Sequence, residues 1–477
     1  MTFLTHELKL FIDIYLFLIL GYAILIMSSY LILAQLSTRE LKSYLKKNSF
    51  VDYNVLLTSE FAPSLSLIAP AYNEGFTIEE NVKSLLSLNY NNYQVIVVND
   101  GSKDNSMEIL IKKYDLVLTD LKVHTKIETK KIKGLYTSRN AAYKKLIVVD
   151  KENGGKADAL NVGLNIAQNR YIVCIDVDCI LDKDSLLKLA KPFLGSYGKR
   201  VIATGGVVRI ANQCIIKNGR LVEVNIPDLL LPRIQVLEYL RAFLLGRMAW
   251  GKLDGLLLIS GAFGAFDKEI ALLAGGYNTK TVGEDMELVV RMRRYMLENK
   301  IPYTVGYIPD PLCWTEAPED FKIFKKQRSR WMRGTIETLS FHKKMFLNPK
   351  YKLLGMLSVP YWTLFEFLAP AIEFIGLVIT IIFLILGLLN WHFFFLLLLF
   401  VYFFAVMFSV IALYSEERTY HKYPKQADFL KLLLAALIEP LYFHPLTVYA
   451  ALIGYKEKLT GAKNWGDMTR KGFTKKP

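Results

Sequence analysis

The chain has 477 residues, 52% of them hydrophobic, and its 59 Lys and Arg against 44 Asp and Glu give a net charge of +15. Such a charge could serve nucleic-acid binding, but the basic residues lie beside apolar segments and no RNA-binding signature accompanies them. A membrane surface and an anionic substrate explain the charge better, so we expect no nucleic-acid partner.

Apolar residues are concentrated in a few long segments. Residues 10–34, 361–389 and 391–414 are each long enough to cross about 30 Å of hydrocarbon as a helix. Residues 40–340 have the mixed composition of a water-facing domain. A fourth apolar segment, 429–455, contains Glu and Pro residues, so a broken span, a re-entrant segment and an interfacial helix all stay open. The pattern predicts a protein of the lipid bilayer with a large water-facing domain.

The first span has the features of a retained membrane anchor. It lacks the basic region and the small-residue cleavage site of a secretory signal peptide. Basic residues at its inner end, Arg39, Lys42, Lys46 and Lys47, place the following domain in the cytosol by the positive-inside rule. We therefore expect three regions: an N-terminal transmembrane helix (1–38), a cytosolic domain with interfacial helices toward its end (39–345), and a C-terminal transmembrane region with a basic cytosolic tail (346–477).

The water-facing domain begins with apolar strands that alternate with helices. Residues 64–74 (SLSLIAPAYNE) predict a strand and loop, and Thr77 and Glu80 are then spaced as a capping box before a helix. Residues 93–106 (YQVIVVNDGSKDNS) predict a second strand, a polar turn and the start of another helix. A charged, irregular stretch precedes LIVVDKENGGKADALNVGL, and RYIVCIDVD closes the series. Such alternation predicts an α/β domain whose parallel sheet is covered on both faces.

Polar residues follow each of these strands at the point where the strand ends: Asn73 and Glu74, Asn99 and Asp100, Lys156, Asp176 and Asp178. Parallel strands present their carboxyl ends at one edge of the sheet, and ligands bind beyond that edge. We therefore expect these side chains to meet in one ligand site.

Asp176 and Asp178 are two residues apart at the end of the last apolar run. On a strand their side chains would share a face, and two like charges ~4 Å apart repel by ~4 kcal/mol at an effective dielectric of about 20. A shared proton, a salt bridge or a bound cation could each relieve this repulsion, and a solvated acid pair is the plainer alternative. Hard cations such as Mg²⁺ and Mn²⁺ prefer carboxylate ligands. We favour Asp178 as a metal ligand, with Asp176 contacting a ribose or supporting the metal.

Two further motifs carry charged groups. NGGK (153–156) lacks the Walker A spacing, yet its glycines permit close backbone approach and Lys156 could meet a diphosphate; a plain turn before a helix is the alternative. VGED (282–285) places Glu284 and Asp285 at a helix N-terminus, where the helix dipole alone could account for them. In the functional interpretation, Asp285 is the general base that removes a proton from an attacking sugar hydroxyl.

Residues 200–340 are less regular, with a glycine-rich loop in LISGAFGAFDKEI and a basic, aromatic helix in FKIFKKQRSRWMRG. In QRSRW, Gln327, Arg330 and Trp331 fall at positions i, i+3 and i+4, so they share a helix face. An amide, a guanidinium and an indole together suit recognition of a sugar and a diphosphate. An interfacial membrane helix with snorkelling basic side chains is compatible with the same pattern.

The order of these motifs resembles the signature of a known family, the membrane-embedded processive family-2 glycosyltransferases. Four motifs match its D, DxD, D, QxxRW pattern: Asp100, Asp176-x-Asp178, Asp285 and Gln327-x-x-Arg330-Trp331. The family includes cellulose, chitin and hyaluronan synthases and bacterial poly-N-acetylglucosamine synthases. The resemblance implies a GT-A fold, which is a Rossmann-like, mostly parallel α/β domain, here inserted between transmembrane helices. It also implies an inverting mechanism, a UDP-sugar donor and a divalent metal, Mg²⁺ or Mn²⁺.

The resemblance further implies roles for individual residues. The nucleotide-sugar would be bound by Tyr72, Glu74, Asp100, Lys156 and Asp176. Asp178 would bind the metal, and Asp285 would be the catalytic base with Glu284 beside it. The acceptor and diphosphate would be bound by Gln327, Arg330 and Trp331. WGDMTR (465–470) resembles the gating loop of hyaluronan synthases with two inserted residues, which would give Trp465 and Arg470 that role.

Together these expectations describe a bacterial plasma-membrane polysaccharide synthase with a cytosolic catalytic domain. It would transfer sugar from a UDP-sugar, with UDP-N-acetylglucosamine as the best guess, to a growing β-linked polysaccharide acceptor and help to export it. A small membrane accessory subunit stays open as a partner. A non-processive transferase that makes a glycolipid is the alternative enzyme, and a membrane transporter or scaffold with a nucleotide-sensing domain is the alternative of another class.

Overall fold

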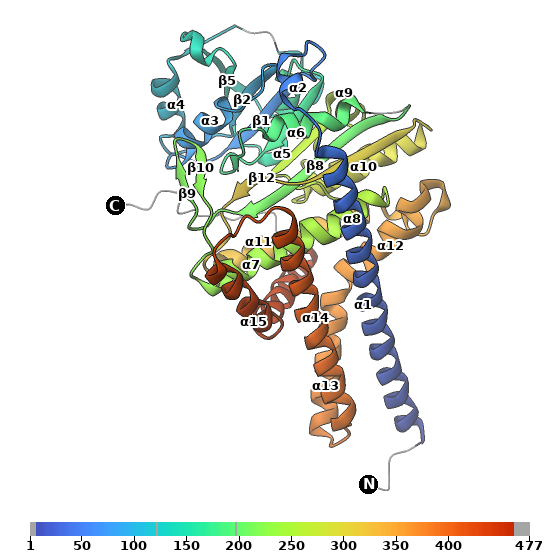
Figure 1. The fold of residues 1–477 in the computed structure, drawn as a ribbon. Coiled ribbons are helices and arrows are strands. Elements are labelled where there is room, and N and C mark those ends of the chain that lie inside the picture. The colour runs from blue at the N-terminus through green and yellow to red at the C-terminus, as the bar shows by residue number, and fades with distance from the viewer. Residues whose placement is uncertain (1–5, 121–122, 196–197, 462–477) are drawn as a thin grey trace.

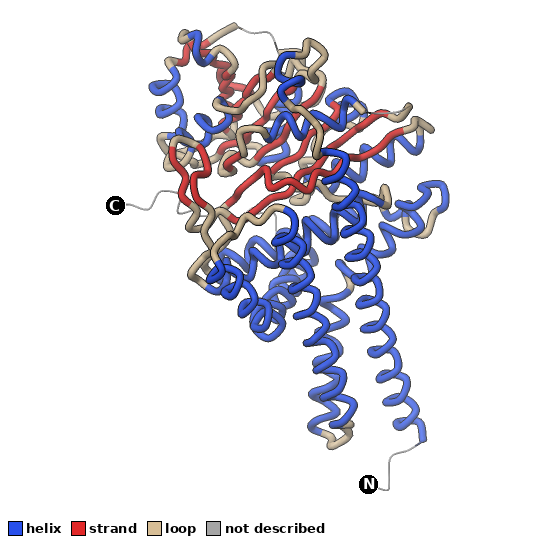
Figure 2. Tube along the Cα trace, viewed as in Figure 1, coloured by secondary structure: helices blue, strands red, loops and turns tan. Residues whose placement is uncertain are grey.

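The computed structural model describes residues 6–120, 123–195 and 198–461. A sheet domain forms one end of the molecule, and long helices extend from it (Figures 1 and 2). Within the described ranges, ten strands form one mixed sheet, in the spatial order β3 (Leu116–Leu118), β4 (Ile132–Ser138), β5 (Leu146–Lys151), β2 (Tyr93–Asn99), β1 (Leu65–Ala71), β6 (Tyr171–Ile175), β11 (Phe263–Asp267), β8 (Arg200–Ile210), β12 (Tyr303–Thr315) and β7 (Ile180–Leu181).

The centre of the sheet is the parallel part that the sequence predicts. Strands β5, β2, β1 and β6 are neighbours and run parallel, whereas β3, β4, β11 and β7 pair antiparallel with their neighbours. Along β1, Leu65 and Leu67 enter one hydrophobic core and Ile68 enters another on the opposite face. Continuous apolar runs therefore arise because both faces of these strands are buried.

Helices cover both faces of the sheet and continue into the extended part of the molecule (Figure 1). Those of the sheet domain are α2 (Asn54–Thr58), α3 (Ile78–Leu86), α4 (Ser106–Tyr114), α5 (Lys156–Ile166), α6 (Ser185–Ala190), α9 (Lys268–Leu273) and α10 (Glu284–Glu298). Those between the sheet and the extended part are α7 (Leu230–Leu240), a π-helical turn (Arg241–Arg247), α8 (Met248–Lys252), α11 (Phe321–Phe341) and α12 (Val359–Tyr361). The extended part consists of α1 (His6–Asn48), α13 (Ala369–Ile385), α14 (Trp391–Thr419) and α15 (Gln426–Leu459). Strands β9 (Ile215–Lys217) and β10 (Arg220–Glu223) form a separate two-stranded hairpin.

Four helices of the described chain are long and apolar enough to cross a membrane: Leu10–Asn48, Leu354–Ile385, Trp391–Thr419 and Gln426–Leu459. The first and third contain the predicted spans 10–34 and 391–414, and the second covers the predicted span 361–389 as far as Ile385. The fourth is the ambiguous segment, and it forms one continuous helix with Pro440 and Pro445 inside it, so the broken span is wrong. Helices of this length and hydropathy indicate a membrane protein.

Two predictions of irregular structure are also wrong. The charged stretch after α4 contains β3 and β4, which extend the sheet beyond β5. The less regular second half contributes β8, β11 and β12, and β11 lies inside the segment expected to be a glycine-rich loop. Glycine in these strands makes room for large neighbours, because a Cβ on Gly206 would lie 2.7 Å from the ring of Phe263.

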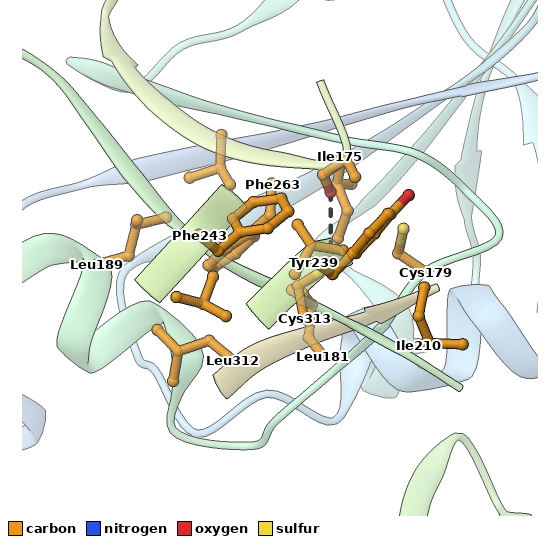
Figure 3. Packing of buried hydrophobic residues seen from close by; sticks show 14 of the residues in the cluster. Ile175, Cys179, Leu181, Leu189, Ile210, Tyr239, Phe243, Phe263, Leu312 and Cys313 are labelled. Atoms are coloured by element: carbon orange, nitrogen blue, oxygen red, sulfur yellow. Dashed lines mark hydrogen bonds between the residues drawn. The ribbon is translucent and has the colours of Figure 1, made fainter. Parts of the chain in front are cut away.

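These added strands build the core beneath the carboxyl end of β6. Figure 3 shows Ile175 at the end of β6 beside Phe263 of β11, in the same hydrophobic cluster as Leu312 and Cys313 of β12. Tyr239 of α7 closes the same cluster from the helical side. The end of β6 is thus supported by residues more than sixty positions away in the sequence.

The capping box predicted at the start of α3 does not form, because Thr77 and Glu80 hydrogen-bond to other groups. Thr77 occupies the N-cap position, but its hydroxyl donates to the Glu74 carboxylate at 2.9 Å. The Glu80 carboxylate accepts a hydrogen bond from the Gly219 N–H at 2.7 Å. Tertiary contacts have therefore replaced the local pair that the sequence suggested.

Candidate active site

The carboxyl ends of β5, β2, β1 and β6 lie at one edge of the sheet, as the sequence predicts. Two loops at this edge are joined by hydrogen bonds between their backbones and side chains. Asn73 N–H donates to Ser102 Oγ at 3.0 Å, Lys103 N–H donates to Asn73 Oδ1 at 2.9 Å, and Glu74 N–H donates to Ser106 Oγ at 3.0 Å. Tyr72 at the end of β1 is 41% exposed. The edge is therefore a fixed platform with an accessible aromatic ring.

Asp100 lies in a buried polar network. One carboxylate oxygen accepts hydrogen bonds from Lys151 Nζ and from Gly154 N–H at 3.0 Å, and the other accepts from Gly155 N–H at 2.8 Å. The fully buried Lys151 also pairs with Asp158 at 2.7 Å. Asp100 therefore holds the NGGK loop, and through it the position of Lys156 at the start of α5.

The loop after β2 must pass close to the NGGK segment. Gly101 adopts φ of +69°, and a Cβ there would lie 2.8 Å from the Asn153 backbone nitrogen. Asn153 Nδ2 donates to the Asp100 carbonyl at 2.8 Å across this contact. A residue with a side chain would separate the two loops, so glycine is needed here.

The Asp176–Asp178 motif occupies a turn. Strand β6 ends at Ile175, and Cys179 N–H donates to the Asp176 carbonyl at 2.9 Å, so the expectation that both carboxylates project from a strand is wrong. Asp176 pairs with Lys156 Nζ at 2.5 Å, whereas Asp178 is 3% exposed. Of the three ways to compensate this acid pair, the structure shows the salt bridge.

Lys156 joins this turn to the second acid pair. Its Nζ lies 3.4 Å from the Glu284 carboxylate, and burial, which lowers the pKa of Lys156, is outweighed by Asp176 and Glu284, which raise it above its ordinary value. Burial raises the pKa of the Glu284 carboxyl above its usual range, although Lys156 acts in the opposite direction. Asp285 Oδ2 accepts the Gly261 N–H at 2.9 Å, and its other oxygen accepts the Met286 N–H at 2.8 Å.

The QRSRW segment forms part of α11, as predicted. Gln327 is buried, and its Oε1 has no hydrogen-bond partner among the described residues. Burial raises the pKa of Glu284 and the positive charge of Arg330 acts to lower it, so α11 lies near the acid pair. Trp331 is 42% exposed, and the Arg328 guanidinium lies 4.2 Å from its ring centre. Arg328 also forms a bidentate pair with Glu238 at 2.5 and 2.6 Å, so it supports the helix and does not snorkel toward lipid headgroups.

The sequence interpretation missed three charged residues around the site. Lys151 ends a predicted strand, and a lysine at the end of a buried strand was the signal that could have indicated a carboxylate partner there. Arg247 interrupts an apolar segment; burial lowers its pKa while the charges of Tyr307 and Asp285 oppose that shift. Glu337 has no local signal, because its partners come from other elements. Trp465 and Arg470, the predicted gating residues, lie outside the described residues.

Two family models match this chain, "Glycosyl transferase family 2" over residues 66–213 and "Glycosyl transferase family group 2" over residues 171–407. The chain carries a family-2 glycosyltransferase domain. The matched ranges contain the strand-end groups, the two acid pairs and the α11 motif of this glycosyltransferase. They also extend into α13 and α14.

Curated relatives of the glycosyltransferase include poly-beta-1,6-N-acetyl-D-glucosamine synthases. That of Staphylococcus epidermidis is 27% identical over 301 residues, which is 62% of this chain and 60% of the relative. That of Staphylococcus aureus is 28% identical over 307 residues, 63% of this chain and again 60% of the relative. The similarity thus spans about three fifths of the length of these relatives.

A solved structure shows the same fold. The mannosyltransferase PcManGT from Pyrobaculum calidifontis, in complex with GDP-Man and Mn²⁺, superposes with a TM-score of 0.52 and 16% identity, covering 93% of this chain and 99% of that one. The glycosyltransferase therefore has a GT-A fold with a mixed, mostly parallel sheet, flanked by long apolar helices.

Proposed function

We propose that this glycosyltransferase is a polysaccharide synthase of the bacterial plasma membrane, with its catalytic domain in the cytosol. It would transfer N-acetylglucosamine from UDP-N-acetylglucosamine to a growing β-linked polymer and help to export it. The observation that supports the proposal is the charged cluster of Asp176, Lys156, Glu284 and Asp285, in which Lys156 pairs with Asp176 and lies 3.4 Å from Glu284. The choice of sugar follows the names of the staphylococcal relatives.

The donor would lie at the strand edge. Tyr72 offers an exposed ring for stacking on a uracil base, and the loop of Glu74 and Asp100 borders it. Since the Asp100 carboxylate already accepts three hydrogen bonds, its part is to hold the NGGK loop beneath the nucleotide. Lys156 is then positioned to leave Asp176 for a diphosphate, which carries more negative charge than one carboxylate.

A divalent cation fits the donor set of this edge. In the described chain no group of three or more His, Cys, Asp and Glu side chains is arranged to hold a metal. Mg²⁺ and Mn²⁺ are, however, often bound by one or two carboxylates together with substrate phosphates, and Asp178 and Asp176 offer such carboxylates. A bound cation would neutralise charge on the departing diphosphate.

The acid pair supplies the base. Asp285 would accept the proton of the acceptor hydroxyl as that oxygen forms a bond to the anomeric carbon, while the bond from this carbon to the UDP oxygen breaks with its electron pair leaving on UDP. One displacement inverts the anomeric centre. Gly261 and Met286 N–H groups hold the Asp285 carboxylate in place. Gln327, Arg330 and Trp331 on α11 would bind the acceptor end.

Polar groups in the apolar helices support the export role. Arg241 forms an ion pair with Glu439 of α15, and Ser409 of α14 donates to the same carboxylate at 2.9 Å. His444 of α15 lies 2.7 Å from the Glu373 carboxylate of α13. Ionisable side chains within membrane helices are costly, and they often mark the path of a polar substrate.

Turnover of the purified full chain tests the proposal. In liposomes containing Mn²⁺, we expect UDP release from UDP-N-acetylglucosamine above that from UDP-glucose, UDP-galactose or UDP-glucuronate, and a ladder of polymers by mass spectrometry. A single sugar on a lipid would favour the glycolipid alternative and contradict the polymer. Nucleotide binding without UDP release from any donor would contradict the enzyme and favour the sensor.

A further inference from the structure

The loop that leads into the catalytic helix α10 is held by one buried carboxylate of α11. Glu337 Oε2 accepts hydrogen bonds from the Thr281 hydroxyl at 2.8 Å and from the Val282 N–H at 3.0 Å. Thr281 Oγ1 in turn accepts the Gly283 N–H at 3.1 Å. Glu337 and Thr281 are each 5% exposed, so water does not compete for these contacts. The two residues that follow this loop are Glu284 and Asp285.

A backbone contact fixes the distance between this loop and α11. A Cβ built on Gly283 would lie 2.7 Å from Gly334 Cα, and one built on Gly334 would lie 2.7 Å from Gly283 Cα. Both obstacles are backbone atoms, so neither position can take a side chain unless the loop moves. Gly334 is three residues before Glu337, which places it on the same face of α11.

The second oxygen of Glu337 reaches a helix of the extended part. Lys458 Nζ of α15 donates to Glu337 Oε1 at 3.0 Å. The two helices approach closely one turn earlier, where a Cβ on Gly454 would lie 2.7 Å from the Ser329 carbonyl oxygen. Burial raises the pKa of Glu337, but the hydrogen bonds from Val282, Lys458 and Thr281 outweigh it and hold the pKa below its ordinary value. The carboxylate is therefore charged at neutral pH.

We propose that Glu337 is a positioning residue for the catalytic base: it fixes the Thr281–Gly283 loop on α11 and, through Lys458, joins that loop to the end of α15. This inference rests on the proposed function, since it assumes that Asp285 accepts a proton. The role is geometric. Within the described part of the chain, the hydrogen bonds of the Glu337 carboxylate go to Thr281, Val282 and Lys458, and none goes to a residue of the strand edge.

Two substitutions of Glu337 separate positioning from bulk stability. Glu337→Ala removes both loop contacts, and a base displaced by about 1 Å can cost on the order of 100-fold, so we expect kcat to fall at least about tenfold. The KM for the UDP-sugar should stay within about twofold, because the donor edge is untouched. Glu337→Gln keeps an oxygen that can accept from Thr281 and Val282, and it should restore most of kcat. Wild-type kcat in Glu337→Ala, or no rescue by Glu337→Gln, would overturn the inference.

Gly334→Ala displaces the same loop by a different route. Alanine favours a helix more than glycine does, so α11 itself should not be weakened. The added methyl must push Gly283 away, and we expect kcat to fall about tenfold or more. The gain in helix propensity offsets part of the cost of overpacking, so the fold should be kept. An active Gly334→Ala enzyme would contradict the proposal even if Glu337→Ala fails to fold.

The matched control is Glu457→Gln. Glu457 also joins α15 to α11, through Ser329 Oγ at 3.1 Å and Arg333 at 3.7 Å, but neither contact reaches the loop before Asp285. Its kcat should remain within about twofold of wild type. A fall as large as that of Glu337→Ala would show that any loss at this helix pair impairs turnover, which overturns the specific role.

The link to α15 has its own test. Lys458→Met should lower kcat by less than Glu337→Ala, and it should have no further effect when combined with Glu337→Ala, because both act through one carboxylate. Additive effects would exclude the link. If the wild-type chain releases no UDP, the proposed function fails; if it does and these variants match it, only the present inference fails.

Discussion

The proposed donor and acceptor sides of the site are held by different kinds of partner. On the proposed donor side, Asp100 is bound by Lys151, Gly154 and Gly155, which lie 51, 54 and 55 residues further along the chain, at the end of β5 and in the loop that follows it. On the acceptor side, α11 is fastened to α15 by Lys458, and Arg209 at the end of β8 is paired with Glu416 of α14, 207 residues away.

The two sides therefore depend on different parts of the molecule. The donor side is assembled from consecutive strand, loop and helix units, so its geometry depends on the sheet domain alone. The acceptor side depends on helices that are apolar enough to lie in a membrane, so lipid or detergent that loosens those helices should disturb catalysis before it disturbs nucleotide binding. The substitutions below test whether the two sides can be affected independently.

The largest expected effect is at Asp285, on the acceptor side. Asp285→Asn preserves the shape of the side chain but removes the base, which should lower UDP release by roughly 10² to 10⁴-fold. Calorimetry should find UDP affinity within about twofold of wild type, because no donor-edge residue is changed. Turnover at the wild-type rate would show that Asp285 is not the base, and lost UDP binding would show that the two sides are not separable.

The next effect is on the donor side and concerns stability. Lys151→Met leaves the buried Asp100 and Asp158 carboxylates without their shared cation, and such a loss costs about 3–5 kcal/mol. The melting temperature in detergent and the affinity for UDP should both decrease. The control is Lys133→Met, because Lys133 is half exposed and lies 3.8 Å from Asp150. Its effect should be below about 1 kcal/mol. Equal losses in both variants would refute the buried network.

A smaller effect is expected where the two sides meet, at Lys156. This lysine pairs with Asp176, so it would compete with a cation for that carboxylate. Lys156→Met should raise the affinity for Mn²⁺ in the absence of nucleotide at least about threefold, as measured by paramagnetic resonance, because a nearby positive charge is removed. UDP release should nevertheless fall. Unchanged Mn²⁺ affinity would place the metal away from Asp176.

The sequence predicted the strands of the proposed donor side well because their signals are local. The apolar runs of β1, β2, β5 and β6, and the polar residues that follow them, are consecutive, and the parallel arrangement brings them to one edge. The predicted geometry of Asp176 and Asp178 was less accurate, because β6 ends one residue before Asp176. The cation that pairs with Asp176 is Lys156, which comes from the start of α5. Which of several compensating charges is used depends on tertiary distances.

The acceptor side could be predicted only in part. The QRSRW and VGED motifs mark α11 and α10, but β8, β11 and β12 were missed because glycines interrupt their apolar pattern. The glycines serve packing, as Gly206 does under Phe263. Glu337 has no local pattern, since its partners Thr281 and Lys458 lie 56 and 121 residues away. Contacts of this kind require the folded chain.

The smallest expected effect concerns the charge state of Glu284. Burial raises its pKa above the ordinary carboxyl value, so the folded state retains a proton that the unfolded state has already released as pH rises. The folded state then binds more protons, and Glu284 makes unfolding easier as pH increases from about 4.5 through its raised pKa. A glutamine cannot titrate and lacks this slope.

Glu284→Gln should therefore melt at a higher temperature relative to wild type at pH 7.5 than at pH 4.5, with a change of about 1–3 °C between the two values. Melting curves of both proteins across this range give the difference, since titration of the groups away from Glu284 is common to both. The result separates the two acids of the pair: Glu284 would be a buried group whose charge is supported by Lys156, while Asp285 is the one positioned for proton transfer. A temperature difference that does not vary with pH would show that Glu284 titrates normally in the folded protein.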